Sequence, residues 1–113
     1  MTTLAEKIRA ARNLTIKVGH MTFHARRPSV EEYGAIYQAG TKDPDLARQF
    51  VTGWEGVREC DLLRGGSQDL VPYDADLWRE AVSDLPEVWR EICSALVKAT
   101  QEHLTKTEKN KKN

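Results

Sequence analysis

The segment at residues 50–57, with the sequence FVTGWEGV, constrains the fold of this chain more than any other. Its Gly53 can end a helix, and Trp54 follows that glycine directly. Farther along the chain, Pro72 and Tyr73 stand where another helix can begin. The glycine, tryptophan and proline side chains offer no nucleophile, general base or metal ligand. We therefore interpret these residues as a packing motif that pins a small domain together.

Composition limits the class of protein. At 113 residues the chain is long enough for one domain with a single modest core. Its 17 basic and 17 acidic side chains cancel, so no net field attracts nucleic acid or an anionic membrane. No stretch approaches the roughly 18 apolar residues that span a bilayer, and the N-terminus lacks the apolar core of a secretory signal. We therefore expect a soluble cytoplasmic protein that binds neither nucleic acid nor a membrane.

A β-hairpin is predicted near the N-terminus. Residues 14–18 and 21–25 each alternate apolar with polar side chains, and Gly19 and His20 between them suit a tight turn. One face of the first strand carries Leu14, Ile16 and Val18. An isolated hairpin is only marginally stable in water, so we expect this face to pack on helices.

Capping boxes mark the starts of two helices. Thr3 with Glu6 opens a short helix before the hairpin, and Ser29 with Glu32 opens a second helix after it. The apolar stripe of the second helix consists of Val30, Tyr33, Ile36 and Tyr37. We expect Gly40 to end this helix, because a glycine accepts the left-handed conformation that closes many helices.

Three more helices are predicted after residue 42. Asp43 caps one that runs to Gly53, and Asp74 caps the next. An interruption at Leu85 and Pro86 separates that helix from a final amphipathic helix. The final helix is the most strongly periodic of them.

Two polar segments interrupt or follow the predicted helices. Residues 58–69 form a polar connection, in which the sequence GGS at 65–67 predicts mobility. Residues 105–113 contain no large apolar side chain and predict a disordered tail. We therefore expect a single globular domain over residues 1–104. The predicted fold class is α+β and mainly helical, with a small N-terminal β-hairpin packed on a bundle of about four to five helices.

The sequence predicts no catalytic, cofactor or metal site. His20 in the predicted turn and His24 on the strand after it stand four residues apart, about 13 Å in extended backbone at about 3.3 Å per residue, so one ion cannot bind both. Cys93 lies on the apolar stripe of the final helix, where a thiol behaves as a small hydrophobic group. Together with Cys60 it fits no metal-binding or disulfide spacing, which predicts reduced thiols. The glycine run at 65–67 lacks the following Lys and Ser or Thr of a phosphate loop.

Aromatic and basic side chains are the remaining candidates for contact with partners. We expect Trp54, Trp78 and Trp89 to anchor the core, because large aromatic side chains dominate burial in small domains. A tryptophan that stays partly exposed would instead anchor a partner. Arg26, Arg27 and the lysines of the C-terminal tail could contact phosphates, which keeps a nucleic-acid-associated regulator open as an alternative.

Taken in order, these features resemble the tail assembly chaperones of long, flexible-tailed bacteriophages. The order is a capped N-terminal helix, a hairpin ending in FHARRP at 23–28, a capped helix beginning SVEE at 29–32, FVTGWEGV at 50–57, VPYD at 71–74 and a closing amphipathic helix. The resemblance covers nearly all of the predicted domain. It departs from the family between Val57 and Val71, where the glycine run lengthens the connection.

The resemblance implies a non-enzymatic assembly factor made in the host bacterial cytoplasm. Such a factor binds the tape measure protein and keeps it soluble while tail tube protein subunits polymerise around it, forms a homo-oligomer, and is absent from the mature virion. A helical client needs an apolar surface, which we expect on the final helix and the tryptophans. The expected contact residues are Trp54, Trp78, Trp89, Ile92 and Leu96. A minor structural subunit of the particle stays open as a further alternative.

Overall fold

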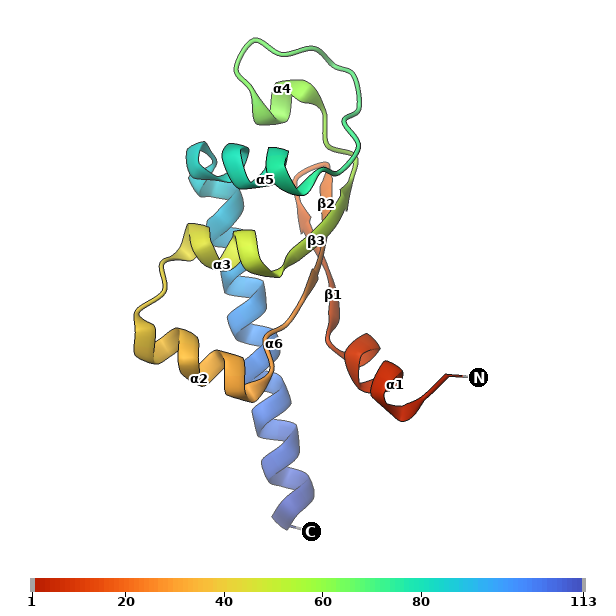
Figure 1. Cartoon of the computed structure of the whole chain (residues 1–113), viewed down its shortest axis with the longest axis vertical. Helices are drawn as coiled ribbons and strands as arrows, with labels where there is room; N and C mark the ends of the chain where they lie inside the picture. The colour runs from red at the N-terminus through yellow and green to blue at the C-terminus, as the bar shows by residue number, and fades with distance from the viewer. Residues whose placement is uncertain (1, 113) are drawn as a thin grey trace.

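The computed structural model describes the backbone of residues 2–112 and the side chains of residues 2–106. In this part of the chain, six helices surround a three-stranded antiparallel sheet with the strand order β1-β2-β3. Figure 1 shows the long helix α6 (Pro86–Lys112) along the molecule, with α2, α3 and α5 crossing it and the strands beside it. The predicted α+β, mainly helical class is confirmed.

The N-terminal elements form where the sequence predicts them. Helix α1 (Leu4–Ala11) begins with the Thr3 hydroxyl accepting a hydrogen bond from the Glu6 amide. Strands β1 (Asn13–Val18) and β2 (Met21–Arg26) form the predicted hairpin, and Gly19 in its turn has a φ of 62°. Their register places Ile16 opposite Phe23. Both side chains are buried, so this face packs on helices as expected.

Strand β3 (Val51–Glu55) corrects the prediction of a helix that runs to Gly53. Helix α3 (Asp43–Phe50) ends three residues earlier, and Val51 is already extended, with a φ of −75° and a ψ of 130°. β3 then pairs with β2, which places Trp54 opposite Phe23. The valine and threonine that begin the strand favour extended backbone, and pairing with an open sheet edge outweighs the helical pattern.

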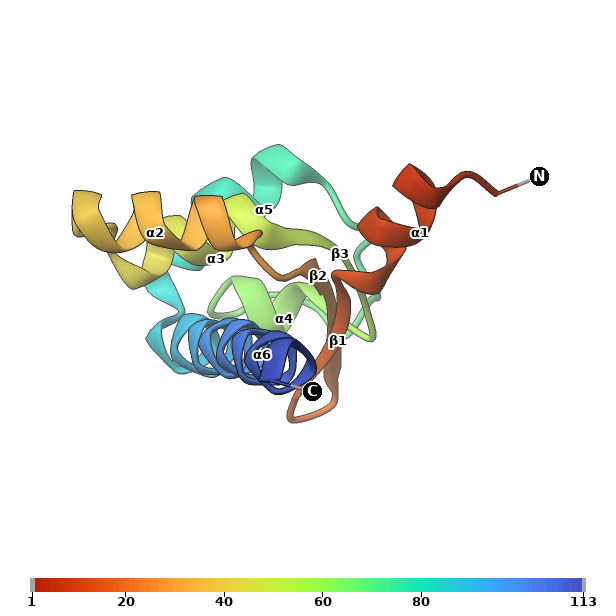
Figure 2. The same cartoon turned by 90° about the horizontal axis from the view of Figure 1, so that it is seen from below.

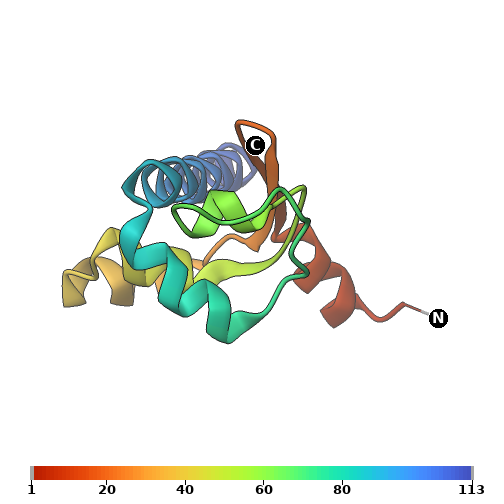
Figure 3. The same ribbon diagram turned by 90° about the horizontal axis from the view of Figure 1, so that it is seen from above.

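Helix α2 (Val30–Ala39) has both halves of the predicted capping box, and Gly40 ends it with a φ of 65°. The polar connection is more structured than expected, because it contains helix α4 (Glu59–Leu62). Figure 3 looks down on α4 and the loop that joins it to α5. In that loop, the Cys60 amide donates to the Ser67 carbonyl and the Gly66 amide to the Leu63 carbonyl. The predicted mobility of this loop stays a prediction.

The last third of the chain follows the predicted order. Helix α5 (Ala75–Ala81) starts at the Asp74 cap, a short 3-10 helix (Val82–Asp84) follows, and α6 begins at Pro86. Its helical backbone continues past residue 104, but side chains beyond residue 106 lie outside the described part. The domain limit at 104 and the disordered tail over 105–113 therefore stay predictions. Over the described residues, no helix combines the length and apolar character needed to cross a membrane.

The core lies between the sheet, α3, α5 and α6. Phe23 is fully buried at its centre, with ring centroids 6.2 Å from Trp54 and 5.4 Å from Trp78. The surrounding aliphatic side chains come from β1, α3, the segment after β3, the 3-10 helix and α6, and include Ile16, Leu46, Val57, Val82, Val88, Ile92 and Leu96. Helices α1 and α2 lie outside this core, since each of their residues is exposed or half-buried.

Candidate functional site

An apolar groove lies between α2 and α6, and we call it the α2–α6 groove. It has a volume of about 360 Å³ and opens to solvent. The residues that line it are Pro28, Tyr33, Ile36, Tyr37, Gly40, Thr41, Leu46, Leu96 and Val97. All of these side chains are uncharged, so the groove suits an apolar ligand surface.

The start of α2 fixes this helix against the body of the protein. The Arg26 guanidinium donates two hydrogen bonds to the Glu32 carboxylate, at 2.8 and 3.0 Å, and lies 4.7 Å from the centroid of the Phe50 ring. Glu32 also accepts from the Ser29 amide. The hydrogen bonds from Arg26 lower the pKa of Glu32 to about 2, so the pair is charged at neutral pH. The first turn of α2 is therefore anchored by charge, not by burial.

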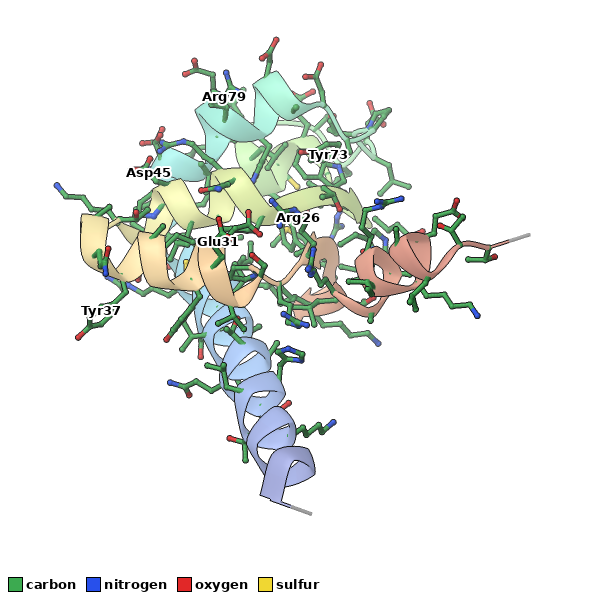
Figure 4. The ribbon with its side chains drawn as sticks, turned by 60° about the horizontal axis from the view of Figure 1, so that its bottom comes forward. Arg26, Glu31, Tyr37, Asp45, Tyr73 and Arg79 are labelled. Carbon is green, nitrogen blue, oxygen red and sulfur yellow. The ribbon has the colours of Figure 1, made fainter. Side chains whose placement is uncertain are left out.

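Three of the four residues in the stripe predicted on α2, Tyr33, Ile36 and Tyr37, form one wall of the groove. Tyr33 and Ile36 are half-buried, and Ile36 packs against the edge of the core. Tyr37 is 81% exposed, and Figure 4 shows its side chain projecting from the far end of α2. Leu46 and Leu96 supply buried side chains from α3 and α6 on the other side. The groove thus has a fixed side of core residues and an exposed aromatic rim.

The five predicted contact residues differ in burial and in position. Trp54 is 6% exposed, Trp78 is 1% exposed and Ile92 is fully buried, so these three belong to the core. Trp89 is half-buried against the core. Leu96 is also buried, but its side chain lines the α2–α6 groove. A contact role for Trp54, Trp78 and Ile92 would require the core to open, whereas Leu96, although only 1% exposed, lies at the buried side of the groove.

The groove-lining tyrosines were not among the predicted contact residues. The sequence identifies Tyr33, Ile36 and Tyr37 only as part of the apolar stripe of a helix. The available signal was the pair of tyrosines in that stripe, because tyrosine combines an apolar ring with a hydroxyl that stays in water and is enriched at interfaces. Aromatic side chains of this kind commonly anchor protein partners.

The two arginines of the nucleic-acid alternative are held by the protein itself. Arg26 is paired with Glu32. Arg27 is 9% exposed and donates to the Pro28 carbonyl at 3.0 Å. Burial, and the nearby charge of Arg12, lower the pKa of Arg27. A phosphate would have to displace these contacts, so the geometry offers the alternative no free pair of arginines here.

Thiols and histidines form no reactive cluster in the described part of the chain. The Cys93 thiol donates to the Asp43 carbonyl, and burial raises its pKa to about 12, which keeps it protonated. The His20 ring bonds to the Asp61 carboxylate at 2.7 Å and so ties the hairpin turn to α4. Among the described residues, no group of three or more His, Cys, Asp or Glu side chains could hold a metal ion.

No protein-family model, curated protein or solved structure matches this chain. The geometry of the α2–α6 groove and the order of sequence features therefore carry the functional argument.

Proposed function

We propose that this chain is a tail assembly chaperone, a non-enzymatic factor that binds an apolar helix face of the tape measure protein in the α2–α6 groove. The observation that carries the proposal is the open, uncharged groove with Tyr37 exposed at its rim. Binding there shields apolar residues of the client until tail tube protein subunits polymerise around it. The chaperone acts in the host bacterial cytoplasm and is absent from the mature virion.

The shape of the groove favours a helical client. A groove between two helices accepts the apolar face of a third helix, whose anchors lie three or four residues apart. An apolar cavity of about 150 Å³ holds a benzene-sized group, so about 360 Å³ holds about two such groups. Two neighbouring anchors on one helix would fill the space. Long helical proteins that await assembly present many such pairs.

The identity of the client rests on the sequence resemblance. The segments that carry it are a packing unit in the structure, since Trp54 in FVTGWEGV bonds to Val71 at the start of VPYD. The resemblance therefore concerns how this domain is held together. The α2–α6 groove is a separate feature, and it supplies the surface that such a chaperone needs.

The alternatives receive less support. A nucleic-acid-associated regulator would rely on Arg26, Arg27 and the lysine tail. Both arginines already have partners inside the protein. The tail side chains beyond residue 106 lie outside the described part. A minor structural subunit of the virion makes no use of an open apolar groove in the free protein. Mass spectrometry of purified virions separates a structural subunit from a chaperone, because a chaperone should be missing from the virions.

Co-expression tests the proposed function directly. The tape measure protein encoded nearest to this gene should be soluble and co-purify with the wild-type chain, and should be insoluble without it. Tyr37→Lys should abolish co-purification, because it places a charge at the rim of the groove. The matched control is Leu63→Lys, since Leu63 is 62% exposed on the α4 loop and does not line the groove. Insolubility of the tape measure protein with the wild-type chain, or equal loss with both variants, would overturn the proposal.

A further inference from the structure

Arg27 is a buried cation that has no acidic partner among the described side chains. The residue is only 9% exposed. In the described part of the chain, its side chain donates one hydrogen bond, to the neutral Pro28 carbonyl, and joins no ion pair. Arginines are almost never buried in proteins unless an acid pairs with them. The missing acid indicates that a partner from outside the chain supplies it.

A second arginine lies beside Arg27 at the base of the hairpin. The register of β1 and β2 pairs Asn13 with Arg26, so Arg12 and Arg27 come next along the two strands. The Arg27 amide donates to the Arg12 carbonyl at 2.8 Å. Arg12 is half-buried, and no ion pair among the described side chains includes it. Glu6, the acid of α1, lies six residues before Arg12, or about 9 Å along the helix axis.

Helix α6 brings a histidine to the same place. Figure 2 shows the C-terminal half of α6 beside β1, close to the point where α1 joins that strand. Thr100 is fully buried on this face of α6, and His103 follows it by nearly one turn. Burial, and the charges of Arg27, Arg12 and Lys106, lower the pKa of His103. We call Arg12, Arg27 and His103 the basic cluster.

Nearby acids do not neutralise the basic cluster. Glu32 is paired with Arg26. Glu31 lies on the opposite face of α2 from the groove-lining side chains, at about 100° of rotation per residue. Glu102 lies one turn before Lys106 on α6, so it offsets that lysine, which is not counted in the cluster. The uncompensated charge at this place is therefore positive.

The basic cluster lies at one end of the α2–α6 groove. Pro28, next to Arg27, lines the groove, and so does Leu96, one turn before Thr100. Between Leu96 and His103, α6 rises by about 10 Å at about 1.5 Å per residue. A helix that fills the groove with apolar side chains would therefore reach the cluster with a side chain about one to two turns farther along.

A single carboxylate is the group that suits the basic cluster. An arginine has five N–H donors in a planar fork that can bind a carboxylate through two hydrogen bonds, and the Pro28 carbonyl takes only one donor of Arg27. Among the described side chains, no buried nitrogen lacks a hydrogen-bond partner, so the other donors of Arg27 reach the surface. A nucleic acid presents a row of phosphates, but the next cation along the chain, Arg26, is bonded to Glu32. An apolar helix that carries one acid matches both the groove and the cluster.

We propose that the client helix carries an aspartate or glutamate about one to two turns beyond its apolar anchors, and that this carboxylate binds Arg12 and Arg27 at the end of the α2–α6 groove. The inference rests on the proposed function and adds a chemical requirement to it, since an apolar face alone does not select the client segment. An anchor of each kind, in a fixed order, also orients the client helix. The carboxylate gives Arg27 the acidic partner that its own chain lacks.

Overlapping peptides that span the tape measure protein are the probe, with the full chain as their receptor. The peptide that binds wild type most tightly by calorimetry is remade with each acidic residue changed in turn to its amide. One such change, about one to two turns from the apolar anchors, should weaken binding at least fivefold. Arg12→Gln should weaken binding of the unmodified peptide by a similar factor. The amide peptide should bind Arg12→Gln and wild type equally, because each change already removes the same contact.

Two further variants and one titration separate binding from folding. Arg9→Gln removes an exposed charge of α1 outside the cluster and should bind the peptide within twofold of wild type. Arg27→Met should bind at least fivefold more weakly, yet should unfold at the same or a higher urea concentration, because it removes an unpaired buried charge. In NMR titrations, the pKa of His103 should rise when the acidic peptide binds and should not rise with its amide form.

The outcomes also separate this inference from the proposed function. A tightest-binding peptide without an acid, equal binding of the acidic and amide peptides, or equal losses with Arg9→Gln and Arg12→Gln would each overturn the inference. Displacement of the peptide by single-stranded DNA at physiological salt would overturn it too, because the cluster would then be a phosphate site. Binding that Tyr37→Lys abolishes and Arg12→Gln leaves unchanged would overturn the inference alone. If no peptide bound wild type, the inference and the proposed function would both fail.

Discussion

The indole nitrogen of Trp54 donates a hydrogen bond to the carbonyl oxygen of Val71 at 2.8 Å, across 17 residues of chain. This bond ties β3 to the segment that leads into α5. The Trp54 ring also packs edge-on against Tyr73, with centroids 4.9 Å apart, and the Tyr73 hydroxyl donates to the Val51 carbonyl at 3.3 Å. The loop between them, including α4, is closed by these contacts.

Trp54→Phe should lower the free energy of unfolding by about 2–3 kcal/mol, because it leaves a small cavity and removes the donor to the Val71 carbonyl. Tyr73→Phe keeps the ring and loses only a long hydrogen bond, so it should cost about 1 kcal/mol or less. Urea unfolding followed by circular dichroism measures both. Similar costs for the two substitutions would show that the indole nitrogen adds nothing.

Glu32→Gln should destabilise the protein at pH 7 by about 1–2 kcal/mol. The Arg26 guanidinium would then face a neutral amide in place of the carboxylate that accepts both of its hydrogen bonds. The pKa of Glu32 is lowered from 4.5 to about 2 in the folded state. This contribution is therefore complete above about pH 4.5 and disappears as the pH falls toward about 2. Glu31→Gln, one residue away, is the control and should cost a few tenths of a kcal/mol at most. Unfolding curves of both variants across this pH range provide the measurement. If the difference in free energy of unfolding between wild type and Glu32→Gln did not change with pH, the account would be contradicted.

Gly56→Ala should cost about 2–4 kcal/mol of stability. Gly56 has a φ of 70°, and an added Cβ would lie 2.9 Å from the His20 carbonyl oxygen, so the hairpin turn would have to move. Gly19→Ala is the matched control, since its φ is 62° and its added Cβ meets nothing within 4 Å. That variant should cost only about 1–2 kcal/mol, for the left-handed backbone itself. Thermal unfolding compares the stabilities of the two variants. Equal losses of stability would mean that the contact between the added Cβ and the His20 carbonyl oxygen is relieved without cost.

Local signals in the sequence predict much of this fold. Thr3 and Ser29 both cap true helix starts, although only Ser29 forms a complete capping box; Gly40 ends α2, and Pro86 separates the last two helices. Each of these signals acts through neighbours within a few residues. Helix ends and turns are therefore readable without knowledge of the tertiary structure.

Strand β3 could not be predicted in the same way. Phe50 and Val51 fit an apolar helix face, and Gly53 fits a helix end, so the local pattern favours a longer α3. What selects the strand is the free edge of β2, which lies far away in sequence and accepts Trp54 opposite Phe23. The choice depends on a partner strand that the local pattern does not reveal.

The candidate site shows the same limit. The stripe containing Tyr33, Ile36 and Tyr37 was readable as one helix face, but its spacing does not say whether a neighbour covers it. The tryptophans were readable as large apolar groups, and only packing shows that Trp54 and Trp78 are enclosed. Whether an apolar surface is sealed or open is a property of the assembled tertiary structure.

The central claim is that the α2–α6 groove, and not the tryptophan core, contacts the client. Peptides in overlapping segments that span the tape measure protein can be titrated into the isotope-labelled chain, with amide chemical shifts recorded by NMR. The account predicts that a binding peptide shifts the signals of Tyr33, Ile36, Tyr37 and Thr41 while those of the α4 loop stay in place. Shifts confined to the surroundings of Trp89 or the α4 loop, or no shift with any peptide, would contradict it.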